Sequence, residues 1–220
     1  MTNLSAMIIQ QEKIMLHQQL EAALHQNDMT VPAEMQNKLV NYLQLMLAWN
    51  KVFNLTTITE PKDMIDLHLI DSLAMQPYLH GNRLLDVGSG AGLPGIPLAI
   101  INPEQQWTLL DKNAKKTRFL TQISAELGLK NVKVIHSACE DFHSAVGFDS
   151  ILSRALGTIR LFIESTEHLL SPQGFFLAMK GKYPEEELND IPSRFLVHLI
   201  KKFDIKGRDI TRHVICLRKR

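Results

Sequence analysis

The 220-residue chain is predicted to adopt an α/β fold of the Rossmann-like type, preceded by a helical extension. A glycine turn at 88–92 joins an apolar, strand-like run to an apolar, helix-like run, the first unit of a nucleotide site. From residue 83 onward, strand-like and helix-like segments alternate, as in parallel sheets. Before that point, apolar residues recur at helical spacing. We therefore expect an N-terminal helical cap over residues 1–80 and a cofactor-binding domain over 81–220.

Composition is typical of a soluble globular protein, with 45% hydrophobic and 21% charged residues. No apolar run approaches the ~18 residues of a membrane span, and the N-terminus lacks the pattern of a secretory signal. The two cysteines, Cys139 and Cys216, belong to no C-x-x-C pattern, so neither a disulfide framework nor a metal site is expected. These features favour a cytoplasmic protein without a membrane partner.

The net charge of +1 conceals an uneven distribution. Residues 1–80 carry a net charge of −4, residues 81–150 are neutral, and residues 151–220 carry +5. A basic final third is compatible with a polyanionic partner, although a solvated surface is the alternative.

The first 80 residues are predicted to be mainly helical. One helix is expected within 1–30, and Thr30 is expected to cap a second helix with Pro32 near its first turn. The helical pattern breaks at Trp49–Ile58, whose amides and hydroxyls suggest a loop with a polar role. A further helix is expected from Asp63 to Tyr78.

His68 and Asp71 lie three residues apart on this last predicted helix. Such a pair can suggest catalysis, but a local hydrogen bond is the favoured interpretation.

The remaining segments are predicted from their apolar patterns and turn residues. Five strands are expected at 83–87, 107–110, 132–136, 148–152 and 175–179, with helices at about 94–101, 113–127, 158–170 and 184–189. Two last strands, at about 195–203 and 211–218, are expected to pair as an antiparallel hairpin through Lys206-Gly207.

The glycine turn identifies the candidate ligand site. Gly88, Gly90 and Gly92 alternate along the turn, and glycine allows positive φ and a close approach to a ligand. Gly90, Gly92 and Gly95 also match the dinucleotide fingerprint G-x-G-x-x-G.

The residues around the turn favour S-adenosylmethionine over a dinucleotide. Asp86 would repel a pyrophosphate, and Pro94 and Pro97 remove backbone N–H donors that a pyrophosphate would need. S-adenosylmethionine has no phosphate, and its ammonium and sulfonium charges suit an acidic neighbour. A dinucleotide site and a purely structural turn remain the alternatives.

Other candidate residues follow the predicted strands, because ligands of open α/β sheets bind at the carboxyl ends of the strands. Asp111 lies 21 residues after Gly90, a spacing at which an acid reaches ribose hydroxyls; the alternative is a helix N-cap. After the third strand, Cys139 can supply a backbone N–H and Glu140 a side chain near adenine. Ser153-Arg154 end the fourth strand.

At several points the chain resembles a known family. The segments that carry the resemblance are DVGSGAGLPGIPLA, WNKVFNLTTI, HLIDSLA, LLDKNAKKTRFL, SRAL and MKGK. Together they resemble the ribosomal RNA small subunit methyltransferase G family, also called glucose-inhibited division protein B, over about residues 35–185.

The resemblance implies a class I S-adenosylmethionine-dependent methyltransferase fold, with a seven-stranded, mostly parallel sheet ordered 3-2-1-4-5-7-6. It also implies methylation of guanine N7 in 16S ribosomal RNA, at position 527 of that RNA. By position it assigns cofactor contacts to Gly88, Leu93, Cys139-Glu140 and Arg154. With the residue-level argument, the predicted cofactor-binding set is Asp86, Gly88, Gly90, Gly92, Leu93, Asp111, Cys139, Glu140 and Arg154.

The implied chemistry agrees with the motifs that the sequence lacks. Guanine N7 has a free lone pair, so the reaction needs alignment rather than a general base. The chain has neither the N/D-P-P-Y/F motif of exocyclic-amine methylation nor a Pro-Cys nucleophile for pyrimidine C5. Arg154 and Lys180 are the candidates for orienting the guanine or its phosphate, and so for the catalytic set.

The expected partner is 16S ribosomal RNA or the small ribosomal subunit, bound by a monomer. The predicted RNA-binding residues are Lys180, Lys182, Arg218, Lys219 and Arg220. Two alternatives remain, namely a small-molecule methyltransferase and a non-catalytic, nucleotide-responsive RNA-binding regulator.

Overall fold

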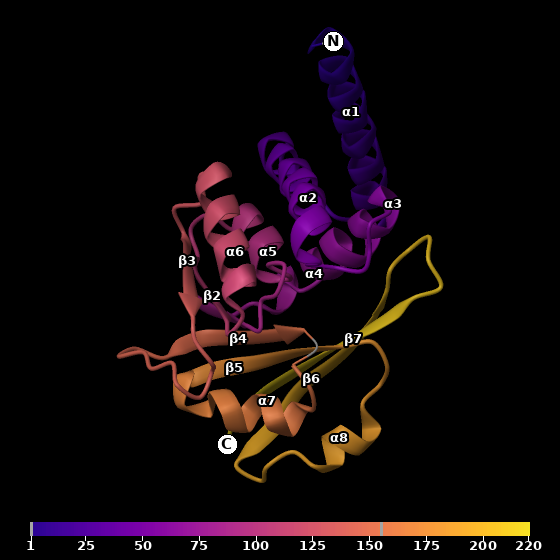
Figure 1. Cartoon of the computed structure of the whole chain (residues 1–220). Coiled ribbons are helices and arrows are strands. Elements are labelled where there is room, and N and C mark those ends of the chain that lie inside the picture. The colour runs from indigo at the N-terminus through magenta and orange to yellow at the C-terminus, as the bar shows by residue number, and fades with distance from the viewer. Residues whose placement is uncertain (1, 155) are drawn as a thin grey trace.

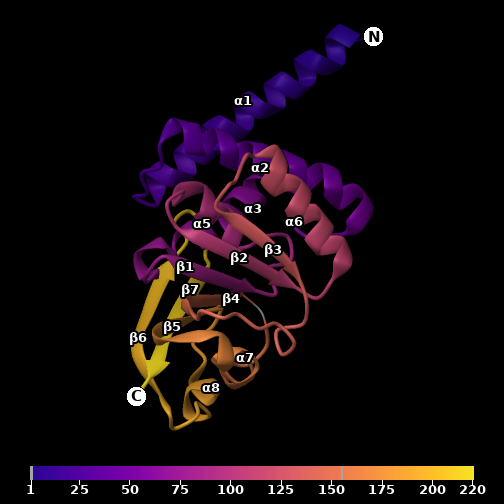
Figure 2. The same ribbon diagram turned by 90° about the vertical axis from the view of Figure 1, so that its left-hand side faces the viewer.

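A computed structural model describes residues 2–154 and 156–220, with side chains from residue 10 on. A seven-stranded sheet forms the centre of the molecule. Helices α5 and α6 cover one face together with the N-terminal helices, and α7 and α8 lie on the other face (Figures 1 and 2). In the described part of the chain, no helix is long and apolar enough to cross a membrane.

The N-terminal segment is helical, as predicted, with two corrections. Helix α1 spans Thr2–Gln26 and helix α2 spans Ala33–Phe53. Thr30 does not cap α2, because Pro32 occupies the N-cap position and no side chain bonds there. The predicted break at Trp49 is also wrong, because the helix continues to Phe53 and the rings of these two residues stack with centroids 5.0 Å apart.

The third predicted helix is real but irregular. It begins as α3 (Pro61–Met64), widens into a π-helical turn η1 (Ile65–Ile70), and returns to α4 (Asp71–Leu73) before a 3-10 turn, η2 (Gln76–Tyr78). A π-helical turn is uncommon and is frequently found at functional sites.

The sheet has the predicted order β3-β2-β1-β4-β5-β7-β6. The first four strands in the chain are β1 (Arg83–Val87), β2 (Gln106–Asp111), β3 (Val132–His136) and β4 (Phe148–Arg154). The last three are β5 (Leu170–Lys180), β6 (Phe195–Asp204) and β7 (Thr211–Lys219). Strand β7 pairs antiparallel with both neighbours, so it alone runs against the rest of the sheet.

The helices between the strands are α5 (Gly95–Ile101), α6 (Ala114–Glu126), α7 (Ile159–Thr166), the 3-10 turn η3 (Glu167–Leu169) and α8 (Glu185–Asn189). Three predicted boundaries shift by two or more residues. The strand predicted at 148–152 extends to Arg154, and Ala155 lies outside the described residues. Helix α7 ends at Thr166, and β5 starts at Leu170 because its pairing with Phe148 extends the strand past Pro172.

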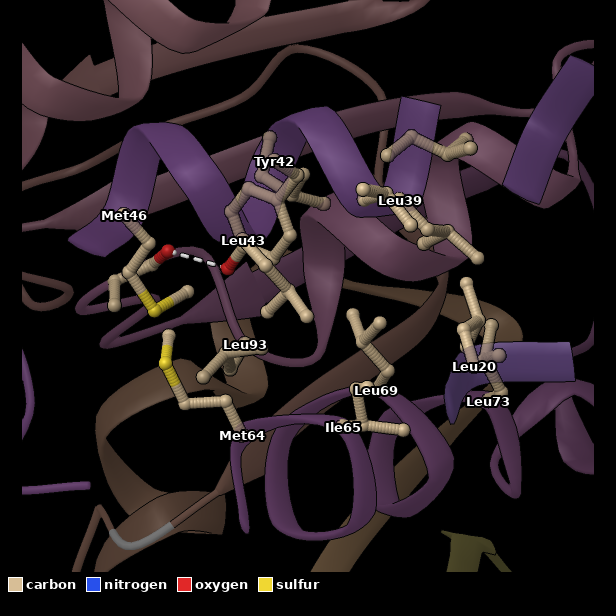
Figure 3. Packing of buried hydrophobic residues seen from close by; sticks show 14 of the residues in the cluster. Leu20, Leu39, Tyr42, Leu43, Met46, Met64, Ile65, Leu69, Leu73 and Leu93 are labelled. Carbon is tan, nitrogen blue, oxygen red and sulfur yellow. Dashed lines mark hydrogen bonds between the residues drawn. The ribbon is translucent and has the colours of Figure 1, made fainter. Parts of the chain in front are cut away.

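One apolar cluster joins the N-terminal helices to the sheet. It includes Leu39 and Tyr42 of α2, Leu69 of the π-helical turn and Leu93 of the glycine turn (Figure 3). The tip of the β6–β7 hairpin also enters it through Ile205, which is fully buried. The predicted division at residue 80 stays a prediction, and α2 and α4 on its N-terminal side pack against helices α5 and α6.

Candidate cofactor site at the glycine turn

The glycine turn leaves the end of β1 in a conformation that glycine favours. Gly88, Gly90 and Gly92 have φ values of +68°, +60° and +92°. The N–H groups of Gly88 and Ser89 both donate to the carbonyl of Leu110 on the neighbouring strand, at 2.8 and 3.1 Å. A Cβ added at Gly90 would meet no atom closer than 3.7 Å, so this part of the backbone is open to a ligand.

Asp111 links the turn to the end of β2. One carboxylate oxygen accepts from the Gly90 N–H and the other from the Asn113 N–H, both at 2.8 Å. The side chain that caps α6 belongs to Asn113, which accepts from the backbone N–H groups of Lys115 and Lys116. The N-cap interpretation of Asp111 is therefore wrong, and its carboxylate lies at the turn.

Asp86 lies beneath the turn and is fully buried. Its Oδ2 accepts from the Gly95 N–H at 3.0 Å, and a Cβ at Gly95 would come within 2.7 Å of that oxygen. Its Oδ1 has no partner among the described residues. Burial raises the pKa of Asp86 to about 7, although the hydrogen bond from the Gly95 N–H acts to lower this pKa.

A cavity of about 400 Å³ opens beside the turn, within the size range of small-molecule sites. It is lined by Val87, Gly88, Leu110, Asp111, Lys112, Lys116, Ser137, Ala138, Cys139, Glu140, Leu156, Leu161 and Ser165. Four predicted cofactor residues thus line one cavity, namely Gly88, Asp111, Cys139 and Glu140.

The other predicted cofactor residues do not line this cavity. Gly90, Gly92 and Leu93 form the rest of the turn, Asp86 supports it from below, and Arg154 points to another part of the edge. The sequence argument missed Lys116, whose Nζ lies 3.8 Å from the Cβ position of Gly90. The only signal for it was its place in the first turn of the helix after Asp111.

A larger cavity, of about 790 Å³, lies between the α1–α2 connection, η2 and the end of β6. No residue of the glycine turn lines it, and neither does Asp111. The smaller cavity is therefore the candidate cofactor site, because the glycine backbone and the Asp111 carboxylate lie there.

A second polar group lies at the same edge, around Asp71. The Asp71 carboxylate accepts from Arg154 Nη1 at 3.4 Å and from Arg212 Nε at 3.1 Å. Arg154 also donates to the Leu67 carbonyl of the π-helical turn, at 3.1 Å. The Asp71 side chain is only 3% exposed, whereas both arginine side chains are about a quarter exposed, at 26% and 24%.

Arg212 is the residue that sequence analysis missed here. It pairs with Phe203 of β6, and its neighbour His213 pairs with Lys180 at the carboxyl end of β5, because β7 runs antiparallel and starts at that edge. The signal was the strand order 5-7-6 implied by the family resemblance, which places the start of an antiparallel seventh strand beside the end of the fifth.

The loop after α2 contacts His68 of the π-helical turn. The Asn50 side chain bonds both the N–H and the carbonyl of Thr56, at 2.9 Å each, and the Thr56 hydroxyl lies 3.0 Å from His68 Nε2. Burial lowers the pKa of His68 to about 4, with the nearby Arg154 charge acting in the same direction. The predicted local bond between His68 and Asp71 is wrong, because Asp71 pairs with the two arginines. The His68 carbonyl accepts instead from Ser72 Oγ, at 2.5 Å.

Lys180 does not present a free ammonium. Its Nζ donates to the Glu187 carboxylate at 2.7 Å and to the Gly157 carbonyl at 2.7 Å. Lys182, two residues further along, is exposed.

The basic C-terminus lies at the opposite edge of the sheet. Arg218 pairs with Phe175 near the start of β5, and Lys219 lies 3.6 Å from Glu167. Arg218, Lys219 and Arg220 therefore stand at the amino ends of the parallel strands, away from the glycine turn.

The fold and the turn define a class of protein. A sheet of order 3-2-1-4-5-7-6 with one reversed strand, a glycine turn after β1 and an acidic residue at the end of the adjacent β2 describe a Rossmann-like S-adenosylmethionine-dependent methyltransferase. A solved S-adenosylmethionine-dependent methyltransferase from Geobacter sulfurreducens, in complex with S-adenosyl-L-homocysteine, has a similar fold. Its TM-score is 0.56 at 14% identity, covering 80% of this chain and 98% of that one.

The chain belongs to the GidB family, rRNA small subunit methyltransferase G, whose model matches residues 35–215. The match continues past residue 185, the predicted limit, into the final hairpin. A relative from Pseudomonas putida, named ribosomal RNA small subunit methyltransferase G, is 43% identical over 92% of this chain and 95% of its own length. A relative of the same name from Pseudomonas aeruginosa is 46% identical over 85% of this chain and 88% of its own.

Proposed function

We propose that this protein transfers a methyl group from S-adenosylmethionine to N7 of a guanine in 16S ribosomal RNA. The observation that carries the proposal is the junction of the glycine turn with Asp111 beside a cavity of about 400 Å³. Family membership supports the RNA substrate. The N7 position is what the family resemblance implies, and the lack of motifs for exocyclic-amine and pyrimidine C5 methylation is consistent with it.

The residues around the cavity suit the parts of this cofactor. The Asp111 carboxylate is placed to accept hydrogen bonds from a ribose diol. Gly88 and Gly90 allow the backbone to approach the ligand closely. We assign Cys139 and Glu140, after β3, to the adenine, and a cationic amino-acid tail near Asp86 would favour the ionised form of its carboxyl group. S-adenosylmethionine supplies an electrophilic methyl group.

The target guanine needs orientation rather than deprotonation, because its N7 carries a free lone pair. We assign orientation of the base or its phosphate to Arg154, with Arg212 beside it on the same carboxylate. Lys180 remains a candidate for a phosphate contact, and a phosphate there would compete with Glu187. Lys182 offers a free charge nearby.

The test has a binding arm and a turnover arm. Calorimetry should detect S-adenosylmethionine binding and no comparable NAD binding. Asp111→Ala should weaken the binding of S-adenosylmethionine by about 1–3 kcal/mol, because charge-assisted hydrogen bonds are lost. Tighter binding of NAD would contradict the cofactor assignment. Mass mapping of 16S RNA, from cells with and without the protein, should show one methylated guanine that depends on it.

The turnover arm separates the alternatives. Methylation of small molecules but not of RNA would favour a small-molecule enzyme. Cofactor and RNA binding without any methyl transfer would favour a regulator. Naked 16S RNA and assembled small subunits, compared as substrates, identify the form that the protein acts on.

A further inference from the structure

The glycine turn is held from the sheet side by Asp86 and Asp111, but one of its polar groups has no donor on that side. The Ala91 carbonyl lies at the centre of the turn, and Ala91 is 7% exposed. A buried carbonyl needs a hydrogen-bond partner, since leaving it unpaired costs about 1–3 kcal/mol.

The local sequence removes the usual backbone donors. In a helical turn, the carbonyl of residue 91 would accept from the N–H of residue 94 or 95. Residue 94 is a proline and has no N–H, and the Gly95 N–H donates to Asp86. Among the backbone hydrogen bonds of the described loops and turns, none ends on this carbonyl.

Tyr42, on α2, supplies the missing donor. Its hydroxyl donates to the Ala91 carbonyl at 2.7 Å, across 49 residues of sequence. The side chain is fully buried, and burial raises its pKa well above the ordinary value, so the hydroxyl remains protonated. Figure 3 shows this bond as a dashed line, with Leu43, Met46 and Leu93 around it.

The bond therefore reaches from the N-terminal helices into the cofactor turn. Ala91 lies between Gly90, which Asp111 holds, and Gly92, whose N–H donates to Ser89 at 2.7 Å. Both glycines have positive φ, and glycine has many other conformations available to it. The hydrogen bond to the Ala91 carbonyl restricts both glycines to a single backbone conformation.

We propose that Tyr42 is a positioning residue for cofactor binding: its hydroxyl holds the glycine turn in the conformation that receives the ligand. The inference rests on the proposed function, because it takes the turn to be the cofactor site. The N-terminal helical segment is then part of the cofactor site and more than a cover for the sheet. Cofactor affinity depends on the fraction of molecules in which the turn is correctly shaped.

The decisive variant is Tyr42→Phe, which keeps the ring and removes the donor. The dissociation constant for S-adenosylhomocysteine, measured by calorimetry, should rise about tenfold, the population shift expected from losing one buried hydrogen bond. The Gly92 and Leu93 amides should exchange faster with deuterium. Turnover at saturating S-adenosylmethionine should remain within about twofold of the parent, because the chemistry itself is unchanged.

A matched control distinguishes positioning from general packing. Leu39→Val removes one methylene from the same helix and the same cluster, without touching a polar group of the turn. It should lower the melting temperature by an amount similar to Tyr42→Phe and leave the dissociation constant unchanged. Equal weakening by both variants, or a parent-like dissociation constant in Tyr42→Phe, would overturn the inference. If the parent itself does not bind S-adenosylhomocysteine, it is the proposed function that fails.

Discussion

Asp86 is the residue with the most unusual chemistry in the site. It is a fully buried carboxyl group with one unpaired oxygen, and its pKa rises to about 7. The ordinary pKa of an aspartate is near 3.9. Between these two values the folded state holds a proton that the unfolded state has lost. Asp86 therefore contributes stability below about pH 4, and this contribution is lost as the pH rises toward 7.

We expect Asp86→Asn to change how stability depends on pH. The free energy of unfolding of the parent, minus that of the variant, should fall by about 2–4 kcal/mol between pH 4 and pH 7. His68 acts in the opposite direction, because its lowered pKa costs stability as the pH falls from 6.5 to about 4, but it is common to both proteins and cancels. Urea titrations at four pH values measure the difference. A difference that does not vary with pH would show that Asp86 is not protonated in the folded protein.

At the scale of elements, the π-helical turn connects the N-terminal segment to two strands. Asp71 follows this turn and holds Arg154 of β4 and Arg212 of β7, while the Leu67 carbonyl within the turn accepts a second bond from Arg154. A buried carboxylate between two arginines leaves the group with a net charge of +1. Burial raises the pKa of Asp71, and the two arginines oppose that rise.

We expect Asp71→Asn to impair the RNA step selectively. The two guanidinium groups lose their common partner, so kcat/KM for methylation of small subunits should fall at least about tenfold, as expected for a lost charge-assisted contact. Cofactor affinity should stay within about twofold of the parent.

The matched control is Asp66→Asn, within the π-helical turn that precedes Asp71. Asp66 is also buried, but its carboxylate pairs with Lys62 and Arg208, away from the glycine turn. Single-turnover methyl transfer compares the two variants. Equal losses in both would reduce the role of Asp71 to folding.

At the scale of the whole molecule, the reversed β7 decides which cations face the site. The basic final third of the chain is divided between two edges of the sheet. Arg212 lies at the edge of the glycine turn, and Arg218 to Arg220 lie at the other. A count of charges does not distinguish Arg212 from the C-terminal cations, whereas the direction of β7 places them at opposite ends of the strand.

We expect the basic C-terminus to act only through long-range attraction. Replacing Arg218, Lys219 and Arg220 by glutamine should slow methylation of small subunits by about twofold at low salt and not at all at high salt, because the gain from releasing counterions falls as the salt concentration rises. Arg212→Gln should reduce the rate at every salt concentration. A salt series for both variants tests this, and a salt-independent loss from the tail variant would place the RNA at the far edge.

Much of the fold is encoded locally and could be predicted from the sequence. Strands β1 and β3 have the predicted bounds, and the predicted final hairpin and the sheet order are confirmed. Apolar runs, glycine turns and prolines act over a few residues, so pattern suffices for them. The glycine turn and Asp111 were found in the same way, because a short βα unit fixes their spacing.

The remaining features depend on contacts between distant segments, which no local pattern records. The Asp71 carboxylate pairs with Arg154 and Arg212, which lie 83 and 141 residues further along the chain. The hydrogen bond from Tyr42 to the glycine turn spans 49 residues. From the sequence, Lys180 was predicted to contact RNA, but in the folded protein its ammonium group forms an ion pair with Glu187. The sequence by itself determined most of the elements and the candidate cofactor turn, and the sheet order, implied by the family resemblance, is confirmed. Only the tertiary structure decided which charges are paired and which edge they face, because pairing depends on distances that exist only after the chain has folded.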